Sequence, residues 1–162
     1  MNIPHPLSLI LLFPTVALLL LFFVPAQKVC CIRRISNIGA LLSALLSVWV
    51  FASYDHIVGG FQFIDKVLWV APFGISYHLG VDGINSVLVL LLGIASFAGV
   101  LITQSIKERV KEYYILLLLM IIGTYGAFLS VDIFFFYFFH EVAAIPAYLL
   151  IAVWGSGRKE YA

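Results

Sequence analysis

One carboxylate in this sequence lies where a charge is energetically expensive. Glu141 is the single charged residue of the apolar stretch 133–154, and it lies close to the midplane if that stretch crosses a membrane. A charge there costs at least ~2.5–3.5 kcal/mol, so an intramembrane carboxylate usually carries protons, holds an ion or pairs with a buried cation. We therefore predict that Glu141 takes part in proton translocation. The alternative is a protonated glutamate that hydrogen-bonds a neighbouring helix and has only a structural role.

Three other residues of the same stretch support a functional site. Tyr137 lies four residues before Glu141 and Tyr148 lies seven residues after it, so in a helix the three share one face. Pro146 has no backbone N–H and displaces the carbonyl of Val142, which opens the helix one residue from the carboxylate. An opened turn beside a carboxylate is a suitable place for water or an ion.

His140 adds a second titratable group, but it points about 100° around the helix from Glu141. Histidine suits a proton relay, and a neutral histidine that donates one hydrogen bond to another helix is an equal alternative. The rest of the sequence has no metal-ligand spacing, nucleophile triad or glycine-rich phosphate loop. We therefore expect no metal and no cofactor in this chain.

The composition shows what must surround these residues. Of the 162 residues 64% are apolar and 10% are charged, whereas a soluble domain has about 45–50% apolar and about 25% charged residues. So few charges could not cover the surface of a soluble domain of this size. The net charge of +1 also provides no basic field for nucleic acid. We expect the lipid bilayer to be the solvent for most of the chain, and no nucleic-acid partner.

The sequence predicts an all-α, polytopic bundle with five transmembrane helices in a single membrane domain, 1–162. A helix needs about 20 mostly apolar residues to cross the hydrocarbon. The candidate runs show no alternation of period two, so a β-barrel is disfavoured. The predicted spans are 7–24, 35–54, 84–103, 113–130 and 133–154.

Polar and small residues indicate how these helices begin and meet. Asp82 and Asp132 are candidate N-caps of the third and fifth helices. The loop 54–83 is the only long one, and its pattern fits either a short hairpin or an interfacial segment. Small residues four apart would permit close helix contacts: Ala95 and Gly99, Gly123 and Ala127, Ala143 and Ala147.

Lysine and arginine gather in the loops that would lie on one side of the membrane. Of the nine basic residues, only Lys66 falls on the other side. Cytoplasmic loops carry the excess of basic residues, so we predict the N-terminus outside and the C-terminus inside. The residues on the predicted inner side are Lys28, Arg33, Arg34, Lys107, Arg109, Lys111, Arg158 and Lys159.

Two runs of residues resemble a known family. Residues 74–85, GISYHLGVDGIN, resemble the stretch that opens the third helix of subunit M of the respiratory NADH:quinone oxidoreductases, or complex I. Residues 136–155, FYFFHEVAAIPAYLLIAVWG, resemble the fifth helix of that family, which has an aromatic-rich lead, a glutamate, a proline five residues later and a Trp-Gly end. Family members are much longer, so the resemblance implies the N-terminal part of a longer, antiporter-like subunit.

The resemblance implies a role for one residue and leaves another open. Glu141 matches the essential glutamate of the family's fifth helix, which works there with a lysine on a later helix. His140 stands where many members have tryptophan, so no family role is carried over to it.

The function implied by the resemblance is H⁺ transport coupled to quinone reduction, with no redox chemistry in this chain. Flavin, Fe–S clusters and quinone would belong to partner subunits. The implied partners are other membrane subunits, including antiporter-like paralogues, in a bacterial inner membrane. One alternative is a subunit of an Mrp-type cation/proton antiporter or a related membrane-bound hydrogenase. Another is a non-catalytic membrane scaffold in which Glu141 ties two helices together.

Overall fold

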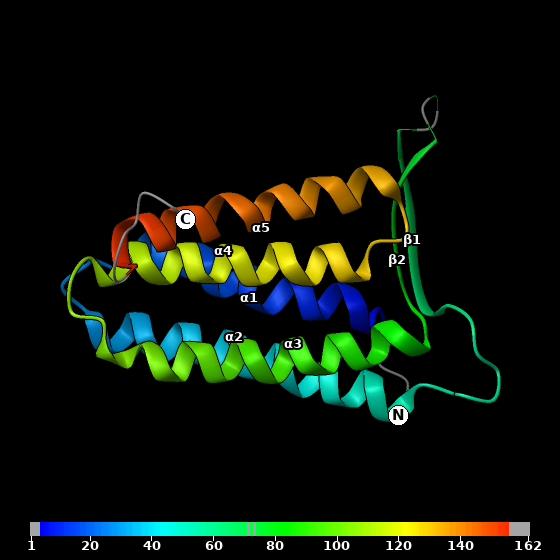
Figure 1. Ribbon diagram of the computed structural model, residues 1–162, viewed down its shortest axis with the longest axis horizontal. Coiled ribbons are helices and arrows are strands. Elements are labelled where there is room, and N and C mark those ends of the chain that lie inside the picture. The colour runs from blue at the N-terminus through cyan, green and yellow to red at the C-terminus, as the bar shows by residue number, and fades with distance from the viewer. Residues whose placement is uncertain (1–3, 71, 73, 156–162) are drawn as a thin grey trace.

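Five long helices lie side by side, and a two-stranded hairpin crosses one end of them (Figure 1). The computed structural model describes residues 4–70, 72 and 74–155. Each of the five α-helices has at least 18 residues and is apolar enough to cross a membrane. The helices are α1 (Pro6–Phe23), α2 (Val29–Ser53), α3 (Gly83–Ile102), α4 (Val110–Leu129) and α5 (Ile133–Trp154), with a short 3-10 helix η2 (Thr103–Ser105) after α3.

The first four helices form the core of the bundle. α1 packs on α2 and α4, and α2 packs on α3. Two tyrosines of α4, Tyr114 and Tyr125, are the largest fully buried side chains. Around them lie buried aliphatic side chains from α1 to α4, which include Ile10, Leu21, Ile32, Val50, Val89, Val100 and Leu118.

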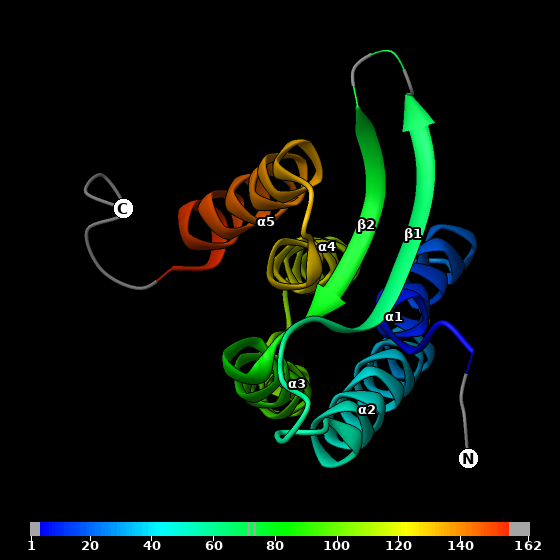
Figure 2. The same cartoon turned by 90° about the vertical axis from the view of Figure 1, so that its right-hand side faces the viewer.

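α5 lies outside this core, against α4, at the edge of the bundle (Figure 2). Within the described part of the chain α4 is the helix on which it packs closely, and Pro146 is its one buried residue. Most of the surface of α5 is therefore open.

The hairpin consists of β1 (Gln62–Val70) and β2 (Ile75–Val81), which pair antiparallel. It lies over the end of the bundle where α1 begins and α2 ends (Figure 2). The ring of Phe63 packs on Trp49 at a centroid distance of 5.8 Å, and Val131 donates its N–H to the carbonyl of His78 at 2.8 Å. The loop 54–83 therefore forms a hairpin, which was one of the two alternatives from its sequence.

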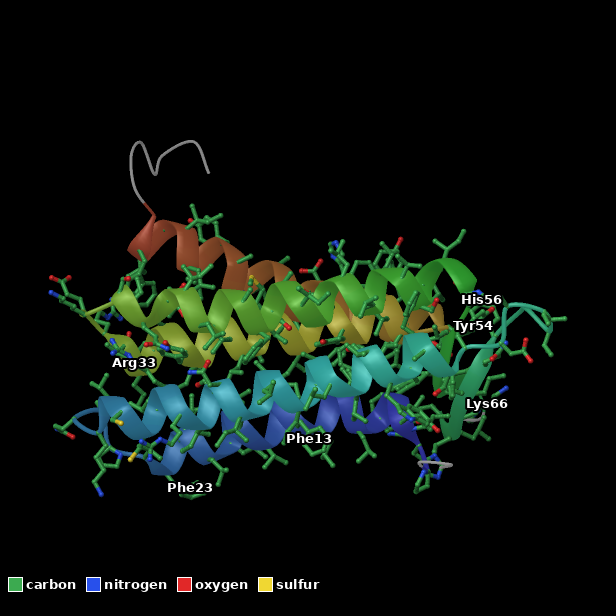
Figure 3. The ribbon with its side chains drawn as sticks, turned by 90° about the horizontal axis from the view of Figure 1, so that it is seen from below. Phe13, Phe23, Arg33, Tyr54, His56 and Lys66 are labelled. Atoms are coloured by element: carbon green, nitrogen blue, oxygen red, sulfur yellow. The ribbon has the colours of Figure 1, made fainter. Side chains whose placement is uncertain are left out.

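The mostly helical fold with five candidate membrane helices is the predicted one. The second helix extends beyond the predicted membrane span 35–54, because α2 begins at Val29. Arg33 and Arg34 are good helix formers, so the helix continues past the apolar run on which the prediction relied. Figure 3 shows Arg33 at one end of the bundle and Lys66 at the other. Arg158 and Lys159 lie outside the described residues.

Candidate functional site

The start of α5 is fixed by Asp132, which is its N-cap residue. The carboxylate accepts hydrogen bonds from the N–H groups of Phe134 (2.9 Å) and Phe135 (3.4 Å), which have no partner inside the helix. It also accepts from the backbone N–H of Ser76 at 3.0 Å. One side chain thus caps α5 and joins it to β2. Asp82 caps α3 in the same way, since it accepts from the N–H of Asn85 at 2.7 Å.

The rotation of α5 about its axis is set by close contact with α4. A Cβ atom on Gly123 would lie 2.8 Å from the Cα of Ala143, so the two backbones touch there. One turn further along α4, the ring of Phe139 covers Gly126 and leaves no room for a side chain. Phe139 is partly buried against the core. These contacts direct one face of α5 toward α4 and the opposite face outward.

Glu141 lies on the outward face. It is the ninth residue of α5, about 12 Å along a helix that rises ~1.5 Å per residue, and its side chain is exposed. It borders a shallow, almost wholly apolar depression of about 500 Å³ with Ile133, Phe134, Tyr137 and Phe138. Within the described residues its carboxylate has no hydrogen-bond partner and no cation. The carboxylate therefore projects from a face of α5 that the described residues leave open.

The two tyrosines predicted to share this face are there. Tyr137 and Tyr148 are each 61% exposed, and Tyr137 lines the same depression as Glu141. Neither phenol makes a hydrogen bond to Glu141. The face is polar at these positions and otherwise apolar, as the spacing indicated.

His140 and Pro146 are not brought together with the carboxylate. The His140 ring is exposed and lies 6.2 Å from the ring of Phe136, one turn earlier. Pro146 is buried, and α5 runs through it as one helix. Among the described residues, no three His, Cys, Asp or Glu side chains lie close enough to hold a metal ion.

A polar cluster that the sequence did not reveal lies at the hairpin end of the bundle. Asp65 of β1 is buried and accepts from His5 Nδ1 at 2.7 Å and from the hydroxyl of Ser8 at 2.8 Å. The hydroxyls of Ser8 and Tyr77 lie 3.3 Å apart, and burial raises the pKa of Tyr77 above its usual value while the Ser8 contact lowers it. These residues are far apart in the sequence, so no spacing signal could have grouped them.

A second unpredicted feature is a buried polar contact between helices, in the half of the bundle nearer the hairpin. The hydroxyls of Ser47 on α2 and Tyr125 on α4 lie 3.1 Å apart. Ser43, one turn before Ser47, donates to the carbonyl of Ile10 on α1 at 2.8 Å. Two serines four residues apart in an apolar helix were the available signal for a helix contact.

Comparisons with known proteins extend over almost the whole chain. No family model matches it. Chloroplastic NAD(P)H-quinone oxidoreductase chain 4 of Chlorokybus atmophyticus is 36% identical over 163 residues, which cover 100% of this chain and 32% of that protein. NADH-quinone oxidoreductase subunit M of Rickettsia conorii is 31% identical over 140 residues, 85% of this chain and 28% of the relative.

This chain is a homologue of chain 4, or subunit M, of the quinone oxidoreductases. It spans about a third of the length of the curated relatives that it matches. Among solved structures, a chain of respiratory complex I from Thermus thermophilus with bound NADH superimposes with a TM-score of 0.75 at 28% identity, and covers 91% of this chain and 29% of that one. The structure of the membrane-bound sulfane sulfur reductase, an archaeal respiratory membrane complex, gives 0.70 at 25% identity, with the same coverage.

Proposed function

We propose that this chain acts in the proton-translocating membrane part of a respiratory NADH:quinone oxidoreductase and that Glu141 carries the proton. The observation that carries the proposal is the place of Glu141: about halfway along a helix long enough to cross a membrane, on a face that the described residues leave uncovered. Homology to chain 4 and subunit M supports the choice of complex. Glu141 is then a group that binds and releases H⁺ in a site completed by another membrane element.

The energetics favour a site of this kind over a bare carboxylate in lipid. Moving one charge across the membrane costs about 2.3 kcal/mol per 100 mV, so a translocating group must change its affinity for H⁺ during the cycle. A mobile cation or a change in hydration next to the carboxylate produces such a change. No lysine of this chain lies within the described helices near Glu141, so the second group belongs to a different element.

The proposed function also assigns this chain its partner subunits and its orientation in the membrane. Quinone reduction takes place in partner subunits, where flavin, Fe–S clusters and quinone reside, and this chain supplies no redox group. Its partners are other membrane subunits of the complex, including antiporter-like ones, in a bacterial inner membrane. The end with Arg33 faces the cytoplasm and the hairpin end faces outward.

The test is Glu141→Gln in the assembled complex, with NADH-driven acidification of inverted membrane vesicles as the readout. We expect electron transfer to quinone to continue in part and acidification per NADH oxidised to fall by the share of H⁺ that this subunit carries. Glu108→Gln is the matched control, because Glu108 is exposed in the loop before α4, and it should pump normally. Normal pumping by Glu141→Gln, with normal assembly, would refute the proposal.

A second candidate has an observation of its own. The likeness to the membrane-bound sulfane sulfur reductase complex favours a respiratory membrane complex with a different electron acceptor. The same vesicles distinguish the two candidates. A quinone-site inhibitor abolishes acidification if the complex reduces quinone, and does not abolish it if the complex uses a different electron acceptor. The 31–36% identity to quinone oxidoreductase subunits over nearly the whole chain favours the first.

A further inference from the structure

A groove between α2 and α3 opens at the end of the bundle opposite the hairpin. Its volume is about 490 Å³. Polar side chains stand at its mouth, namely Arg33, Arg34 and Asn37 of α2 and Gln104 of η2. Its deeper walls are apolar and include Leu41 of α2 and Leu101 of α3.

The two arginines at the mouth of the groove have N–H donors that no hydrogen bond to the described residues uses. Arg33 donates from one terminal nitrogen to the carbonyl of Ile106 at 2.9 Å, while its Nε is buried and has no partner. The one hydrogen bond that Arg34 makes to the described residues goes to the sulfur of Cys30, at 3.8 Å. Neither guanidinium pairs with a carboxylate among the described residues. An arginine has five N–H donors in a planar fork, so the mouth offers several unused donors and two positive charges.

The depth of these residues matches the layers of a bilayer. α2 has 25 residues and is about 37 Å long, more than the ~30 Å of hydrocarbon, so its first turns reach the headgroup layer. Arg33, which Figure 3 labels at this end of the bundle, and Arg34 are the fifth and sixth residues of α2, and so belong to those turns. Leu41 lies seven residues beyond Arg34, about 10 Å deeper, at acyl-chain level.

We propose that this groove binds one anionic phospholipid. The phosphate lies between Arg33 and Arg34, where the guanidinium forks bind its oxygens, and an acyl chain runs inward along Leu41 and Leu101. Charge complementarity at the mouth and the apolar wall below it together select a lipid over a free phosphate or a neutral lipid. The site does not involve Glu141 and is independent of the proposed function.

The test measures lipid that stays with the protein. The chain, with whatever subunits remain bound, is extracted in mild detergent and exchanged into phosphatidylcholine micelles with 5 mol% phosphatidylglycerol, about one lipid in twenty. Native mass spectrometry and lipid extraction then count each lipid per protein. We expect about one phosphatidylglycerol per chain, and about tenfold less in the double variant Arg33→Gln/Arg34→Gln. The control Lys28→Gln/Lys107→Gln removes the same charge from exposed side chains at the same end and should change retention less than about twofold.

A second variant keeps both arginines and guards against misfolding of the first. Leu101→Trp blocks the apolar wall and should lower retention as strongly, whereas Leu91→Trp, on an exposed part of α3 outside the groove, should not. Soluble glycerol phosphate at millimolar concentration should not displace the lipid. Four results would each overturn the proposal. Two concern the variants: an equal loss of lipid in the lysine control, or full retention of lipid by Leu101→Trp. Two concern the unmodified protein: displacement of the lipid by glycerol phosphate, or no preference for phosphatidylglycerol. The last result would also be expected if a protein segment covered the groove.

Discussion

Gly123 of α4 lies directly against the backbone of Ala143 of α5, with only 2.8 Å between a Cβ at position 123 and the Ala143 Cα. This contact fixes how α5 is rotated, and Glu141 is two residues from it. The face that carries Glu141 is outward because the face that carries Ala143 is bound to α4. The proposed proton site therefore depends on a glycine on a different helix.

We expect Gly123→Ala to weaken the contact between α4 and α5. The added methyl group has no space, and overpacking of this kind costs about 1–3 kcal/mol. The matched control is Gly99→Ala, because nothing lies within 4 Å of a Cβ there. Alanine is the better helix former, so Gly99→Ala should be neutral or stabilising by up to about 1 kcal/mol. Thermal unfolding in detergent measures both, and equal midpoints for the two variants would contradict the packing described.

The same contact shows what the sequence could and could not predict. The five helices follow from their apolar runs, since a backbone in lipid must satisfy its own hydrogen bonds. The positions of Glu141, Tyr137 and Tyr148 on one face follow from the helical repeat alone. The sequence showed Gly123 and Ala143 as small residues that could permit close helix contacts. It did not show that these two residues meet, because that depends on how the two helices are arranged in space.

Contacts between residues that are far apart in the sequence could not be predicted for a similar reason. Nothing in the alternation of residues 61–70 shows that Asp65 is buried, or that it meets His5 and Ser8. The predicted span 35–54 leaves out the first six residues of α2, because hydropathy marks the apolar core of a helix and not its polar first turns.

The buried contact between Ser47 and Tyr125 should contribute measurably to stability. Ser47 donates its hydroxyl hydrogen to the carbonyl of Ser43 at 2.9 Å, so the Tyr125 hydroxyl must be the donor to Ser47. Tyr125→Phe removes that donor and should lower the free energy of unfolding by about 0.6–1.7 kcal/mol. Tyr148→Phe, on the exposed face of α5, is the control and should change it by less than about 0.5 kcal/mol. A cost no larger than that of the control would show that the contact contributes nothing.

Asp65 should hold the hairpin to the start of α1. Asp65→Ala leaves the Ser8 N–H and hydroxyl and the His5 ring without their shared acceptor, at a cost of about 1–3 kcal/mol. We expect faster proteolytic cleavage within 62–81 and a lower midpoint of thermal unfolding. Lys66→Ala, the next residue of β1, has an exposed side chain and should leave both unchanged. If cleavage rates are the same in the two variants, the cluster does not anchor the hairpin.

The cap on α5 should make the protein sensitive to acid through one residue. Hydrogen bonds from the backbone N–H of Ser76 and from those of Phe134 and Phe135 hold the pKa of Asp132 below its usual value, against the opposing effect of desolvation. A carboxyl whose pKa is lower in the folded protein stabilises the fold at pH values above its unfolded pKa of about 3.9. That contribution is lost as the pH falls through the folded-state pKa.

Asp132→Asn keeps a good N-cap residue but removes the charge, so it separates capping from titration. At neutral pH the variant should be less stable than the unmodified protein by no more than about 1 kcal/mol. The difference should shrink as the pH falls below about 4, since the unmodified carboxylate is then also becoming neutral. The difference is measured directly by the thermal unfolding midpoints of both proteins, taken at evenly spaced pH values between pH 7 and pH 3. A difference that stays constant over this range would show that the Asp132 charge does not stabilise the junction of α5 with Ser76.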